Sequence, residues 1–195
     1  MLDWFWGGWR EIRLYQRDAL ICLSLFTLAV LAGHIVAVLN VDQAAKYYDL
    51  VKEVIIADSA GIIPEDLFLF ILSRNTLVSF TLLVLGIVTY NVWPVFVVLL
   101  NGVLAGFIVQ TQAFMSDQSV LLIWLFGLLP HGVPELGAIF LAAGASFYYR
   151  RRRGQGERII ERLLKTFLTV VLPLLIIAAI IETSFTPFLI STFLL

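Results

Sequence analysis

Three residues that can take part in acid–base or metal chemistry lie inside stretches that are otherwise apolar enough to cross a membrane. His131 and Glu135 stand four residues apart in "GLLPHGVPEL", and Glu182 lies in "AAIIETSFTPFL". An unpaired charge at the bilayer centre costs at least ~2.5–3.5 kcal/mol, so such residues face the bundle interior and mark polar sites. One histidine and two carboxylates could hold a zinc ion with an open position, form part of an ion path, or join helices by hydrogen bonds.

Two other apolar stretches also carry polar residues. Asn101 lies in the third stretch, and Arg74 and Asn75 lie near the start of the second. Contact with lipid would be costly for each of them. We therefore expect an intramembrane polar site composed of Asn75, Asn101, His131, Glu135 and Glu182.

The charged members of this group need partners. A guanidinium stays charged, so Arg74 requires either a carboxylate or a route to the interface. By depth along the helices, Arg74 is expected to pair with Glu182 or to reach the outer water, and Glu135 is expected to pair with His131.

The composition assigns the chain to the helical membrane proteins. Of its 195 residues 61% are hydrophobic, and the mean hydropathy is +0.96, which is more apolar surface than a soluble domain of this size can bury. The period-two alternation of an outer-membrane barrel is absent. Five stretches are long enough to span: 19–39, 67–90, 94–114, 120–149 and 167–190. The predicted fold is an all-α polytopic membrane protein with five transmembrane helices, forming a single domain over residues 1–195.

The fourth stretch is predicted to be kinked or broken. As a straight helix its residues 120–149 would extend about 45 Å, beyond the hydrocarbon thickness, and Pro130 and Pro134 fall in its middle. A proline removes one N–H and displaces the carbonyl four residues earlier. We expect His131 and Gly132 to lie in a non-helical link, with the helix proper starting near Pro134.

The distribution of charge predicts the topology. Arg10, Arg13 and Arg17 precede the first span, and seven basic residues lie within 150–166. The positive-inside rule places both segments in the cytoplasm, and four crossings between them satisfy this. The C-terminus is then external. Residues 1–17, rich in tryptophan and arginine, are predicted to lie at the cytoplasmic membrane surface.

Two further elements are expected outside the polar site. Residues 40–66 have the spacing of a short amphipathic helix in an external loop. Gly102 and Gly106 form a GxxxG pair, which lets another helix approach closely. That pair favours packing within the chain over a homodimer face.

The motifs resemble those of the stage II sporulation protein M family. The likeness rests on "SRNTLVSF", "NGVLAGF", "LLPHGVPELGAIFLAAGA" and "AAIIETSFTPFL", in that order, with PHGxPE the most specific element. Arg74 stands where many relatives have a neutral residue. The family's motif positions here would be Asn75, Asn101, Gly102, Pro130, His131, Gly132, Pro134, Glu135, Glu182, Thr186 and Pro187.

The resemblance implies an integral membrane protein with a polar site inside the membrane. In spore-forming bacteria the namesake works beside cell-wall hydrolases, and the family also occurs in organisms that form no spores. It therefore implies envelope-associated protein partners without implying sporulation.

Three classes of function stay open on the sequence. We favour a non-enzymatic component of an envelope- or membrane-remodelling complex. The alternatives are a dimeric transporter or channel for a proton, ion or small solute acting through His131, Glu135 and Glu182, and an intramembrane metal-dependent hydrolase. An HExxH motif and a convincing nucleophile are absent. We expect no cofactor, with zinc on His131 and Glu135 as the one candidate, and we expect the lipid bilayer but no nucleic acid as a partner.

Overall fold

The structure, a computed structural model, describes residues 2–41, 43, 44, 46, 48, 50, 67–153 and 158–194. Over these residues the regular structure is helical throughout and contains no strand. Five helical runs are long and apolar enough to cross a membrane: Asp3–Leu39, Leu67–Val88, Val92–Ser116, Val120–Arg151 and Ile159–Phe193. The predicted all-α, five-span fold is confirmed.

The first three spans are single helices and the last two are composite. The single helices are α1 (Leu2–Leu39), α3 (Leu67–Val88) and α4 (Val92–Ser116). The fourth span consists of α5 (Val120–Leu122), the π-helical segment η2 (Ile123–Leu128) and α6 (Leu129–Arg151). The fifth consists of α7 (Ile159–Thr166), η3 (Phe167–Val171), α8 (Leu172–Ile180), η4 (Ile181–Phe185) and α9 (Thr186–Phe193).

The prolines coincide with the π-helical segments. Each of η2, η3 and η4 is followed by an α-helix whose second residue is a proline, namely Pro130, Pro173 and Pro187. A proline cannot donate to the carbonyl four residues earlier and its ring clashes with that carbonyl, and a widened π turn accommodates both effects. The predicted non-helical link is therefore wrong, because His131 and Gly132 lie within α6. The kink itself stays a prediction.

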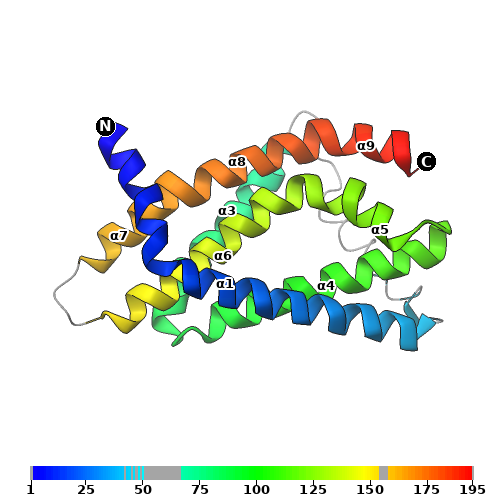
Figure 1. Cartoon of the computed structure of the whole chain (residues 1–195), viewed down its shortest axis with the longest axis horizontal. Helices are drawn as coiled ribbons and strands as arrows, with labels where there is room; N and C mark the ends of the chain where they lie inside the picture. Colours follow the sequence, from blue (N-terminus) through cyan, green and yellow to red (C-terminus); the bar gives the residue numbers. More distant parts are fainter. Residues whose placement is uncertain are drawn as a thin grey trace.

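The α6 helix forms the centre of the bundle, where it packs against α1, α3 and α8 (Figure 1). Its second half carries a run of small buried residues from Ala142 to Ser146. A Cβ added at Gly144 would lie 2.7 Å from the backbone nitrogen of Ala19 in α1. Small side chains thus allow α1 and α6 to approach closely, as is usual between membrane helices.

The GxxxG pair lies against α1 of the same chain. A Cβ added at Gly106 would come within 2.0 Å of the Val30 carbonyl oxygen, and one at Gly102 within 2.7 Å of the Phe26 carbonyl oxygen. Gly33 of α1 is equally close to α4, because a Cβ added at Gly33 would lie 2.1 Å from the Val103 carbonyl oxygen. A homodimer, which stays a prediction, would have to use a different surface.

Ion pairs join α1 to the fourth and fifth spans at one end of the bundle. Glu11 of α1 accepts hydrogen bonds from Lys165 Nζ at 2.8 Å, from Arg162 and from the Tyr149 hydroxyl at 3.3 Å. Asp18, also of α1, is buried and accepts two hydrogen bonds from the Arg151 guanidinium, at 2.6 and 2.9 Å. These contacts fix the relative positions of α1, α6 and α7.

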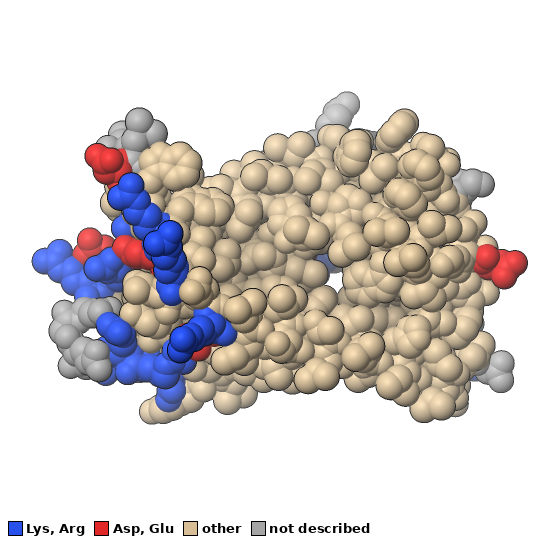
Figure 2. Space-filling model, in the orientation of Figure 1, with Lys and Arg blue, Asp and Glu red and all other residues tan. Residues whose placement is uncertain are grey.

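Lysine and arginine side chains gather at this same end (Figure 2). The N-terminus lies there, and the C-terminus lies at the far end of the bundle (Figure 1). An odd number of crossings requires this separation. Which end faces the cytoplasm stays a prediction from the positive-inside rule.

The three segments predicted to lie outside the membrane have different outcomes in the structure. Residues 2–17 belong to α1 itself, and their location at the membrane surface stays a prediction. The predicted basic loop 150–166 is shorter than expected, because α6 continues to Arg151 and α7 begins at Ile159. Most of the predicted external helix within 40–66 lies outside the described residues.

Candidate functional site

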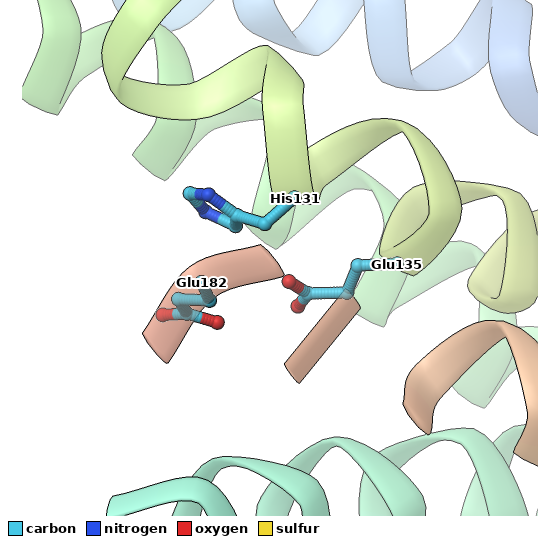
Figure 3. A group of neighbouring side chains, drawn as sticks. All are labelled: His131, Glu135 and Glu182. Atoms are coloured by element: carbon cyan, nitrogen blue, oxygen red, sulfur yellow. The ribbon is translucent and has the colours of Figure 1, made fainter. Parts of the chain in front are cut away.

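The structure brings His131, Glu135 and Glu182 together between the fourth and fifth spans (Figure 3). One nitrogen of the imidazole and one oxygen of each carboxylate all lie within 4.8 Å of one another. His131 and Glu135 are adjacent on one face of α6 because they are four residues apart. Glu182 comes from η4, near the start of that π-helical segment. All three residues are half-buried.

A hydrogen bond fixes the imidazole ring. His131 Nδ1 lies 3.2 Å from Thr186 Oγ1, and Thr186, at the start of α9, is 5% exposed. This contact joins the two composite spans directly beside the carboxylates. From the sequence, Thr186 was predicted to have only a packing role, and its hydrogen bond to the imidazole was not predicted.

A small pocket adjoins His131 and Glu135 on the side of the third span, and Glu182 is not part of its lining. Its volume is about 100 Å³, and its polar lining comes from Asn101, His131 and Glu135. Asn101 Nδ2 donates to the Val97 carbonyl oxygen at 2.8 Å, which leaves the amide oxygen as an acceptor. Apolar groups, among them Phe26 of α1, supply the rest of the lining. Asn101, His131 and Glu135 thus line one pocket, and a functional site composed of the five predicted residues stays a prediction.

Asn75 and Arg74 are placed differently. Asn75 is half-buried on α3 but belongs neither to the three-residue cluster nor to the lining of the cavity. The Arg74 guanidinium lies over the Phe70 ring, 5.5 Å from its centroid. The ion pairs found among the described residues do not include one between Arg74 and Glu182.

The glycines and prolines of the sequence motifs shape the backbone around the site. Gly132 is buried in the first turn of α6, and Pro134 lies inside that helix. Pro130 and Pro187 follow the π-helical segments η2 and η4, and Pro187 is the residue directly after Thr186. These residues set the backbone path that presents His131, Glu135 and Thr186 to one another.

Sequence reasoning overlooked the acidic residues at the basic end. Glu11 lies between Arg10 and Arg13, and Asp18 directly follows Arg17, so the arginines outweigh both carboxylates in the charge of this segment. The available signal was an aspartate directly before an apolar span. A carboxylate at that position must be paired if it is buried.

Comparison with known families agrees with the motifs. The model of the family described as stage II sporulation protein M matches residues 22–187, which include the three-residue cluster, the cavity-lining Asn101 and the glycines that face α1. No curated protein and no solved structure matches the chain. The match covers most of the sequence, and we conclude that this chain belongs to the stage II sporulation protein M family of membrane proteins.

Proposed function

We propose that the protein is a non-enzymatic component of an envelope- or membrane-remodelling complex, in which the polar site holds the last two spans in one arrangement. The size of the cavity is the observation that supports this best. A pocket of about 100 Å³ has room for only a few water molecules. Pockets that receive small-molecule substrates are usually ~300–1,000 Å³, so the space suits water or an ion better than a lipid or a peptide.

The ion pairs at the basic end support the same role. Glu11 joins α1 to α6 and α7, and Asp18 joins α1 to α6 at a second point. A set of helices fixed at one end by such contacts offers a partner a surface of constant shape. The exposed Trp4 and Trp6 beside this network supply aromatic groups at the same end.

Cross-linking in the cells that make the protein tests the proposal. The full chain is cross-linked in its own membranes and purified, and covalently attached proteins are identified by mass spectrometry. We expect an envelope-associated protein in a defined ratio to the chain. An unrelated five-span protein at equal abundance serves as the control.

A conservative variant separates this role from an enzyme. Glu182→Gln keeps the size of the side chain and removes its charge. If the site is structural, cross-linking to the partner should fall only in proportion to the loss of folded protein. A folded variant that keeps its partner but loses all cellular function would contradict a purely structural site and favour catalysis or transport.

The passage of an ion is the second candidate. It is favoured by the three ligand groups on two spans that both contain π-helical segments, a feature often found at functional sites. Flux measurements on the purified chain in liposomes distinguish it. The main proposal expects no flux above empty liposomes, and flux that is lost in Glu182→Gln would support this alternative.

A further inference from the structure

We infer that His131, Glu135 and Glu182 bind one divalent transition-metal ion of the zinc type, which cross-links the fourth span to the fifth. The three candidate ligand atoms come from two separate spans and lie within 4.8 Å of one another. This inference concerns the polar site of the proposed function, but it does not depend on a complex or a partner.

The geometry needs only a small adjustment to hold a metal. Zinc bonds to nitrogen and oxygen ligands are about 2.1 Å long, so ligand atoms in a tetrahedral site lie about 3.4 Å apart. Rotation about the side-chain bonds of the two glutamates would have to close the remaining difference from the observed upper limit of 4.8 Å.

The contact with Thr186 prepares the histidine as a ligand. Metal-binding histidines usually donate the N–H of one ring nitrogen to a neighbouring acceptor, which fixes the tautomer and orients the ring. His131 Nδ1 lies 3.2 Å from Thr186 Oγ1. When Nδ1–H donates to this hydroxyl, Nε2 carries the lone pair that a metal requires. Thr186 is buried, so the geometry of this contact is protected.

The charges of the site also call for a cation. In the described part of the chain, neither Glu135 nor Glu182 forms an ion pair with a lysine or an arginine. Two neighbouring carboxylates inside a membrane are costly when they are unpaired. A divalent ion bound to both neutralises two negative charges at once.

The identity of the ligands selects the class of metal. Calcium takes six to eight oxygen ligands, and magnesium prefers an octahedron of oxygens. One imidazole and two carboxylates supply fewer oxygens and one nitrogen, which suits zinc and its neighbours. The fourth position would be taken by water in the adjoining cavity of about 100 Å³, where Asn101 offers an acceptor oxygen.

Metal binding is measured on the full chain, purified in detergent and stripped with a chelator. Zinc is added, excess is removed by desalting, and zinc per chain is measured by plasma mass spectrometry. The visible absorption of Co²⁺ added in place of zinc reports a four-coordinate site. We expect one zinc per chain and the intense absorption of tetrahedral Co²⁺.

Variants assign the ion to these residues. Glu182→Gln should weaken zinc binding at least about tenfold, and Thr186→Val, which removes only the hydroxyl beside the ring, by about 10–100-fold. Glu161→Gln, an exposed carboxylate of α7 outside the cluster, is the matched control and should bind as the natural chain does. Circular dichroism confirms that each variant is folded.

Two results would overturn the inference. One is a natural chain that retains no more zinc than the Glu182→Gln variant. The other is stoichiometric zinc that is unaffected by both Glu182→Gln and Thr186→Val. Neither result affects the proposed role in a complex, which is tested by cross-linking rather than by metal content.

Discussion

Asp18 is a buried carboxylate, 5% exposed, whose two oxygens are both satisfied by one guanidinium. Bidentate contacts of this kind are stronger than neutral hydrogen bonds and are specific in geometry. The Arg151 side chain remains 55% exposed, so its charge keeps access to water. The pair therefore joins α1 to α6 without burying two charges completely.

Replacing Asp18 by asparagine should destabilise the protein by about 1.5–3 kcal/mol, the range for a hydrogen bond to a charged group. Thermal unfolding in detergent, followed by circular dichroism, measures the change. The control is Glu161→Gln in the exposed Arg158–Glu161 pair, where a surface ion pair contributes about 0–1 kcal/mol. Equal effects of the two substitutions would show that Asp18 is not a structural anchor.

At the scale of elements, the composite fourth and fifth spans determine the site. The desolvation cost of His131, Glu135 and Glu182 was enough to predict that they face the interior, and the structure brings their ligand atoms together. The π-helical segments could not be predicted. A proline indicates that the helical hydrogen bonds are interrupted, but it does not determine which backbone conformation accommodates the interruption. The partners of Glu11 and Asp18 could not be predicted, because they depend on which spans pack side by side.

Two prolines of α6 should differ in their effect on stability. Pro130 follows η2, where the widened turn accommodates its ring, whereas Pro134 lies inside α6. Pro134→Ala restores an N–H to the helix and should stabilise the protein by about 1 kcal/mol, less than the ~3 kcal/mol of an ordinary helix interior. Pro130→Ala should change stability little. Thermal unfolding measures both, and a larger gain from Pro130→Ala would argue against this account of η2.

The contact between α1 and α4 depends on glycines. A Cβ at Gly106 would lie 2.0 Å from the Val30 carbonyl oxygen. Because this oxygen belongs to the backbone, it cannot rotate away as a side chain could. Gly106→Ala should destabilise the protein by about 1–3 kcal/mol through overpacking. Gly137→Ala in α6 is the matched control, because its Cβ would meet nothing within 4 Å and alanine gains up to about 1 kcal/mol in a helix. Similar unfolding temperatures for the two variants would contradict the close approach of α1 and α4.

At the scale of the whole molecule, positive charge gathers at the end where the ion-pair network lies (Figure 2). Arg150 stacks over the Tyr90 ring, 4.2 Å from its centroid, which places the link between α3 and α4 at this same end. The positive-inside rule predicts that this is the cytoplasmic end. Ser119, at the start of α5, would then face outward.

Cysteine accessibility in intact cells tests this orientation. In a Cys22→Ser background, Ser119→Cys should react with a thiol reagent that cannot cross the membrane, because it would lie outside. Val92→Cys, an exposed position at the start of α4, should react only after the cells are opened. The opposite labelling pattern would reverse the topology.

The fourth and fifth spans meet at His131 and Glu182 inside the bundle, and chemical cross-linking can test this contact. In the Cys22→Ser background, the pair His131→Cys and Glu182→Cys should be joined within one chain by a short bifunctional thiol reagent, as shown by the mass of the intact protein. A second pair, Val133→Cys with Glu182→Cys, starts from an exposed position two residues along α6 and should not be joined. Equal cross-linking of both pairs, or of neither, would mean that the two spans do not meet at these residues.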